Sequence, residues 1–213
     1  LPKSNYNKWS SSETTLPTNI SKEVFDKNSV LYRFEHQLKT SSLNTLNVMR
    51  PDFSWSCTNI ENIKRDNQLK EYILLFPFCS AHLDIKKWPY YNELIKLIKN
   101  KFKDRYKVIL APGPNEINDA KNIHATSILD QNKALNISQL SSLIKESSFV
   151  VANDTGPAHM SAHLGAKGLT LFGKHTTAFK VSIERKNFKA IQVDDLNKLS
   201  AEKVFERLFS ILD

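Results

Sequence analysis

The stretch that decides the fold is Ser148–Gly165, which reads SFVVANDTGPAHMSAHLG. Its first part, Ser148–Ala152, is an almost continuous apolar run, as in a strand that is covered on both faces. A polar loop follows, in which Gly156 lets the backbone turn sharply from strand to helix. Pro157 suits the first position of that helix, where a backbone N–H is left unbonded anyway. The stretch therefore predicts a strand, a tight loop and a helix over Pro157–Leu164.

Strands and helices are predicted to alternate elsewhere in the chain as well. We expect further strands at Tyr72–Phe76, Tyr106–Leu110, Leu169–Phe172 and Ala190–Val193. We expect further helices at Pro89–Phe102, Asn115–Ile123, Ser138–Ser147 (with Ser138 as its N-cap) and Ser200–Leu212. Strands that alternate with helices of this length are typical of βαβ units and a parallel sheet. Residues 71–213 are therefore predicted to form an α/β domain, a Rossmann-like parallel sheet with helices on both faces.

Residues 1–70 have a different pattern. They are rich in Ser, Thr and Asn, and only Val30–Leu38 has apolar residues at helical spacing. We expect a mostly irregular N-terminal arm with one helix, which does not fold alone. The chain begins with Leu1 and not with Met, which suggests a fragment or a processed product.

Composition narrows the classes of function. The 213 residues include 30 Lys or Arg against 22 Asp or Glu, and the net charge of +8 favours an anionic partner. A zinc finger, an aromatic RNA-binding strand and a run of five basic residues are all absent, so no nucleic acid is expected. No apolar run is long enough to span a bilayer, and the polar opening is unlike a signal peptide. We expect a cytoplasmic protein, with peripheral contact at the inner face of an anionic membrane as an alternative.

The loop after Ser148–Ala152 carries candidate binding residues, because ligands of open parallel sheets bind where the strands end. The free N–H groups at the start of the following helix, predicted to begin at Pro157, favour an anion such as a diphosphate. Asp154 can accept two hydrogen bonds from a vicinal diol of a sugar, or it can simply cap the helix. His159 lies about one turn into the helix, where it can donate to a phosphate or a sugar hydroxyl, or be a structural histidine.

Two other loops follow predicted strands and carry charged residues. Lys86 precedes a Trp-Pro pair and can reach a phosphate as a compact point charge, or it is an ordinary surface lysine beside Lys87. Glu116 follows a Gly-Pro turn and can hold a ribose or the edge of a base, or it can interact with the dipole of a helix start.

Metal and classical nucleotide motifs are not supported. His159 and His163 have the spacing of paired metal ligands, but no Glu follows His159 as the metalloprotease motif requires. We therefore expect no metal. The fingerprints GxGxxG and GxxxxGK[ST] and the GxSxG nucleophile elbow are absent.

Taken in order, these loops resemble the C-terminal domain of glycosyltransferase family nine, the lipopolysaccharide heptosyltransferases and their relatives, which have the GT-B fold. The resemblance covers about residues 72–213. Its motifs are KKWP at Lys86–Pro89, PGPNE at Pro112–Glu116, VANDTGPAHMSAHLGA at Val151–Ala166 and LTLFG at Leu169–Gly173.

The resemblance implies how a donor would be held. Lys86 would hold the phosphates of the donor, and Thr155 and Gly156 would offer hydroxyl and backbone donors to the same diphosphate, with His159 nearby. Glu116 would contact the nucleoside. The residues implied in donor binding are Lys86, Glu116, Asp154, Thr155, Gly156 and His159.

The resemblance also implies a reaction. Asp154 would grip hydroxyls of the donor sugar, and an acceptor hydroxyl would attack the anomeric carbon as the nucleotide diphosphate leaves. The family chemistry is inverting, needs neither metal nor cofactor, and transfers a heptose-like sugar from a nucleotide diphosphate sugar to lipopolysaccharide or another lipid-linked or surface-glycan acceptor.

The sequence departs from the family at three places. Family members carry an N-terminal Rossmann domain with the acceptor site and a general-base Asp or Glu. Residues 1–70 resemble only the tail of that domain and the connection between domains, so we expect this chain to supply the donor site and to transfer no sugar alone. Lys174–Thr177 and Gly168 stand where relatives often have proline, which bears on the donor sugar. The alternatives are another GT-B-like nucleotide-sugar enzyme, such as an epimerase, and a non-catalytic binding module.

Overall fold

The computed structural model describes residues 16–80 and 83–212, which divide between two compact units. The first unit comprises residues 16–52 and Ala178–Ser182. It contains α1 (Lys22–Phe25), α2 (Val30–Thr40) and α7 (Ala178–Val181), and α2 is the helix predicted around Val30–Leu38. The second unit comprises Phe53–Thr177 and residues 183–212. Residues 53–70, expected in the arm, thus lie in the second unit, and the domain boundary at residue 70 stays a prediction.

The second unit is built on a parallel sheet, as the sequence predicts. Six strands are described, in the order β3-β2-β1-β4-β5-β6, and every neighbouring pair is parallel. Every residue of β1, β4 and β5 is buried, as expected of strands that are covered on both faces. The strands are β1 (Tyr72–Phe76), β2 (Lys107–Leu110), β3 (Thr126–Ser127), β4 (Phe149–Asn153), β5 (Gly168–Phe172) and β6 (Phe188–Gln192).

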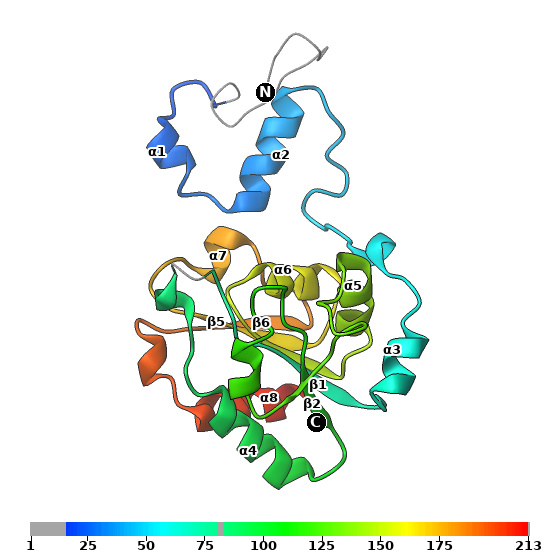
Figure 1. Cartoon of the computed structure of the whole chain (residues 1–213). Helices are drawn as coiled ribbons and strands as arrows, with labels where there is room; N and C mark the ends of the chain where they lie inside the picture. Colours follow the sequence, from blue (N-terminus) through cyan, green and yellow to red (C-terminus); the bar gives the residue numbers. More distant parts are fainter. Residues whose placement is uncertain (1–15, 81–82, 213) are drawn as a thin grey trace. The chain divides into compact units, whose positions relative to one another are not determined.

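Helices cover both faces of this sheet. Figure 1 shows α4 and α8 below the sheet and α5 and α6 above it. Among the described residues, no helix combines the length and the apolar character needed to cross a bilayer. The helices of this unit are α3 (Glu61–Asp66), α4 (Tyr91–Phe102), α5 (Ile137–Lys145), α6 (Gly156–His163) and α8 (Ala201–Leu212), with short 3-10 turns at η2 (Ser54–Ser56), η3 (Asp84–Lys86), η4 (Asp119–Asn122) and η5 (Leu196–Lys198).

The helix predicted over Asn115–Ile123 is wrong. The chain forms turns there, followed by the 3-10 helix η4. The Glu116 carboxylate accepts a hydrogen bond from the Gly113 N–H at 2.7 Å, and the Glu116 N–H donates to the Gly113 carbonyl at 2.9 Å. This local pairing of side chain with backbone competes with helical hydrogen bonds and closes a turn instead.

The N-cap of α5 is also different from the prediction. Asn136, not Ser138, precedes the helix, and its side-chain oxygen accepts from the Gln139 N–H at 2.9 Å. The Gln139 side chain in turn accepts from the Asn136 N–H at 3.0 Å, which completes a capping box.

Substitution Asn136→Ala is expected to lower the free energy of unfolding by about 1 kcal/mol, because it removes the acceptor of an N-terminal N–H. Chemical denaturation measures this difference. Ser138→Ala is the control and is expected to change stability little. Equal losses in the two variants would contradict the assignment of the cap.

Candidate functional site

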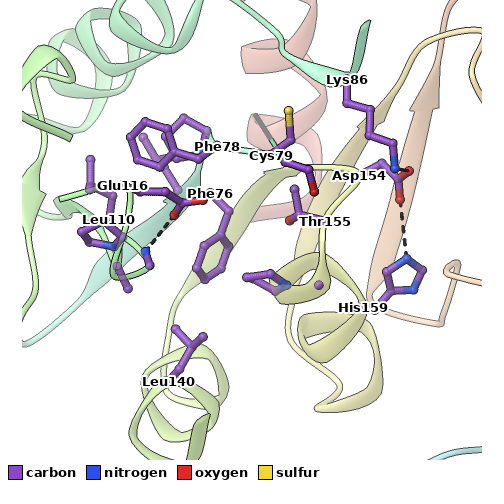
Figure 2. Close-up of a pocket in the computed structure, with 18 of the residues that line it drawn as sticks. Phe76, Phe78, Cys79, Lys86, Leu110, Glu116, Leu140, Asp154, Thr155 and His159 are labelled. Atoms are coloured by element: carbon purple, nitrogen blue, oxygen red, sulfur yellow. Dashed lines mark hydrogen bonds and ion pairs between the residues drawn. The ribbon is translucent and has the colours of Figure 1, made fainter. Parts of the chain in front are cut away.

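A cavity of about 510 Å³ lies at the carboxyl edge of the sheet (Figure 2). The loops after β1, β2 and β4 form its walls. The chain passes from β1 outward to β2 and later returns to place β4 on the other side of β1, and ligands of doubly wound sheets bind at such a switch point. All the residues predicted to bind ligand line this cavity: Lys86, Glu116, Asp154, Thr155, Gly156 and His159.

Buried hydrogen bonds hold the loops after β1 and β4 together. The fully buried side chain of Asn153 donates to the Pro77 carbonyl at 2.7 Å, and its oxygen lies 3.2 Å from the Tyr91 hydroxyl. Trp88 is also buried, and its indole N–H donates to the Leu199 carbonyl at 2.7 Å. The buried Trp88 thus anchors the backbone between Lys86 and the start of α4.

The Asp154 carboxylate faces three cationic or hydrogen-bonding side chains. Lys86 Nζ donates to Oδ2 at 2.7 Å, His175 Nε2 lies 3.0 Å from the same oxygen, and His159 Nε2 lies 3.5 Å from Oδ1. The Asp154 side chain is only 5% exposed. The helix-cap alternative for Asp154 is wrong, because the N-cap of α6 is Thr155. The surface alternative for Lys86 is wrong as well, because its amine is paired with a buried carboxylate.

These contacts set the protonation state of Asp154. Burial opposes the charged form, but hydrogen bonds from His159, Lys86 and His175, together with the charge of Lys86, lower the pKa of Asp154 well below its usual range. The carboxylate is therefore ionised at neutral pH and can accept hydrogen bonds.

The start of α6 offers donors to the same cavity. Thr155 and Gly156 line the cavity, and α6 begins at Gly156, one residue before the position predicted from Pro157. The Thr155 hydroxyl is buried and has no hydrogen-bond partner among the described residues. A Cβ atom at Gly156 would meet nothing within 4 Å, so the backbone here is open to the cavity.

Glu116 lies away from the Lys86–Asp154 pair, at the side of the cavity formed by the loop after β2 (Figure 2). Its carboxylate already accepts the Gly113 N–H. This hydrogen bond stabilises the turn, and the ligand contact predicted for Glu116 would come in addition to it.

Some site residues carry no local signal in the sequence. Apolar side chains line the cavity between Glu116 and α6, and these side chains carry no functional signal in the sequence. His175 belongs to the loop after β5 and contacts Asp154 across the fold. The rule that ligands bind after strands could have directed attention to this loop. The apolar wall residues are Phe76, Phe78, Leu110, Leu135 and Leu140.

The two histidines at metal-ligand spacing have different partners. His159 faces Asp154, whereas His163 Nδ1 lies 3.5 Å from the Arg185 guanidinium. Burial and the charges of Arg185 and His159 lower the pKa of His163 to about 4.

Because the pKa of His163 is lowered in the folded chain, the free energy of unfolding is expected to fall as the pH drops from about 6.5 to about 4. In this range the unfolded chain binds a proton at His163 and the folded chain does not. Urea denaturation at pH 7 and pH 5 tests this, and His163→Gln should show a smaller difference between the two pH values. An unchanged difference would contradict the assignment.

Comparisons with known proteins agree with this architecture. The sequence profile of glycosyltransferase family 9 (heptosyltransferase) matches residues 24–207. Among solved structures, Escherichia coli heptosyltransferase WaaC with ADP superposes with a TM-score of 0.62 at 18% identity, over 92% of this chain and 58% of that one. Escherichia coli ADP-heptose lps heptosyltransferase II gives 0.59 at 18% identity, over 73% and 52%.

A second class of structures shares the fold less closely. Methanocaldococcus jannaschii UDP-GlcNAc 2-epimerase in complex with UDP-GlcNAc and UDP gives a TM-score of 0.52 at 13% identity, over 85% of this chain and 52% of that one. A search of curated proteins gives no match. The chain spans a little over half the length of these solved structures, and at these identities their likeness shows the fold alone. The family profile, which covers most of the chain, shows more: this protein belongs to glycosyltransferase family 9.

Proposed function

We propose that the cavity binds the nucleotide diphosphate sugar donor of a glycosyltransferase, with ADP-heptose as the donor. The observation that carries this proposal is the convergence of Lys86, Asp154 and the start of α6 on one cavity at the switch point of the sheet. Cations and helix N-termini suit a diphosphate, and an ionised carboxylate suits sugar hydroxyls. The acceptor would be lipopolysaccharide or another surface glycan.

Each wall of the cavity then has a task in an inverting, metal-independent transfer. The acceptor oxygen forms a bond to the anomeric carbon as the bond from that carbon to the diphosphate oxygen breaks. Lys86 and the N–H groups at the start of α6 stabilise the charge that grows on the departing diphosphate, as preorganised donors do. Asp154 orients the sugar, and Glu116 with the apolar wall holds the nucleoside. A general base must take the proton of the acceptor, and we expect it outside this cavity.

Calorimetric titration with ADP, UDP, GDP, CDP, ADP-heptose and UDP-GlcNAc tests the proposal. ADP and ADP-heptose are expected to bind, and the folded protein should gain thermal stability in their presence. The epimerase alternative predicts preference for UDP and UDP-GlcNAc instead. Binding of none of the six ligands would overturn the proposal and favour a non-catalytic module.

We also propose peripheral contact with an anionic membrane from the cytoplasmic side. The net charge of +8 supports it, and the segment from Lys96 to Lys107, with both ends included, holds six basic residues and a single acidic one. Co-sedimentation should occur with vesicles that contain phosphatidylglycerol and weaken with salt. Equal binding to vesicles of phosphatidylcholine alone would contradict this contact.

A further inference from the structure

The predicted phosphate ligand and the predicted sugar ligand of the cavity are bound to each other. Lys86 Nζ is 2.7 Å from Asp154 Oδ2, and both side chains line the cavity. One of the three N–H donors of the Lys86 ammonium goes to Asp154. A donor that draws this amine away toward its phosphates removes a partner from a carboxylate that is only 5% exposed, and a buried charge without its partner is costly.

His175 differs from Lys86 in that its position is fixed. Its side chain is 9% exposed, and its ring stacks on that of Phe172 with 5.9 Å between centroids and 19° between planes. Phe172 is fully buried at the end of β5. The Gln192 amide donates to the carbonyls of Gly173 at 2.8 Å and Thr176 at 3.1 Å, which anchors the loop on both sides of His175.

The only hydrogen-bonded contact of the His175 ring, within the described part of the chain, is with Asp154. Nε2 lies 3.0 Å from Oδ2, and Nδ1 is buried without a partner. His175 does not line the cavity, so a donor does not compete for it. Lys86, by contrast, lies on a flexible four-carbon stem that can turn toward a phosphate. His159, 34% exposed and 3.5 Å from Oδ1, is the third group that faces the carboxylate.

From this arrangement we infer that Lys86 is the exchangeable partner of Asp154 and His175 the permanent one. Lys86 moves to the diphosphate of the donor, sugar hydroxyls take its place at Asp154, and His175 acts as a positioning residue that keeps the carboxylate aimed into the cavity. This inference rests on the proposed function. The consequence is selectivity for a nucleotide sugar over a nucleotide diphosphate. A nucleotide diphosphate breaks the Lys86–Asp154 ion pair and offers Asp154 no new partner, whereas the hydroxyls of a nucleotide sugar take the place of Lys86.

Asp154→Asn distinguishes the release of Lys86 to the diphosphate from the binding of sugar hydroxyls by Asp154. The amide holds Lys86 far less strongly, so the affinity for ADP is expected to rise about three- to tenfold, while the ratio of ADP-heptose affinity to ADP affinity falls at least about tenfold. Calorimetric titration of wild type and variant measures both, and circular dichroism checks the fold. An equal fall of both affinities would overturn the exchange.

The role of His175 is tested without any ligand. Carbon-13 NMR titration of the Asp154 carboxyl in the ligand-free chain should show a raised pKa in His175→Ala, and the pKa should return toward the wild-type value in His175→Gln, which keeps an N–H donor. Unchanged titration in His175→Ala would overturn the positioning role. A wild-type chain that binds no nucleotide would overturn the proposed function and the exchange with it, whereas the NMR titration would still decide how Asp154 is held.

Discussion

Lys86→Ala is expected to weaken ADP binding about 10- to 100-fold, because it removes the charge-assisted hydrogen bond that we propose between Lys86 and the diphosphate. Lys86 is placed for this contact by the buried Trp88 and by its position in the wall of the cavity. Calorimetric titration with ADP measures the loss.

Lys87→Ala is the matched control. Lys87 is next in sequence, but its amine pairs with Asp84 at 2.7 Å and it does not line the cavity. This variant should bind ADP within about twofold of the wild type, because an exposed ion pair contributes little. If both lysine variants lost affinity equally, general surface charge and not a defined phosphate ligand would explain binding.

Gly168→Ala is expected to lower the free energy of unfolding by about 3 kcal/mol. Gly168 is the first residue of β5, in register with Val150 of β4 and Phe188 of β6. A Cβ atom there would lie 2.6 Å from the Val150 carbonyl oxygen and 2.7 Å from the Phe188 ring, closer than real Cβ contacts. Since one of these neighbours is backbone in the centre of the sheet, the strands must shift. Urea denaturation gives the size of the effect.

Gly156→Ala provides the comparison for that experiment. A Cβ atom at Gly156 meets nothing within 4 Å, so the free energy of unfolding of this variant should stay near that of the wild type. Equal destabilisation in both variants would mean that loss of glycine flexibility, and not a clash, is responsible. The same environment explains why this chain does not have proline at residue 168: the Gly168 N–H donates to the Asn187 carbonyl at 3.0 Å, and proline has no such donor.

Local patterns were sufficient to predict most of the sheet. β1 and β4 are short apolar runs bounded by polar loops, and burial on both faces requires that pattern. The amphipathic spacing in α4 and α8 was equally informative, because these helices have one apolar side against the sheet. The two-residue strand β3 is too short to have a period and was not predicted.

Errors arose where a side chain bonds to nearby backbone. Glu116 and Asn136 both do this, one closing a turn in place of a helix and the other beginning a helix earlier than Ser138 would. The candidate site followed from the rule that strand ends carry ligands, together with motif resemblance. His175 did not, because its contact with Asp154 depends on how the loops after β4 and β5 meet, and no spacing in the sequence encodes that distance.

The pairing of β1 with β4 has a consequence for how the protein is made. Ile73 lies opposite Phe149, so the two central strands are neighbours in space although β2, β3 and two helices separate them in the chain. Closing so long an intervening segment slows folding, because the chain loses conformational entropy before the stabilising contacts between β1 and β4 form. A growing polypeptide on the ribosome consequently cannot assemble the Lys86–Asp154 pair until β4 has been synthesised and has docked, and a nucleotide could stabilise only chains that have passed that late step.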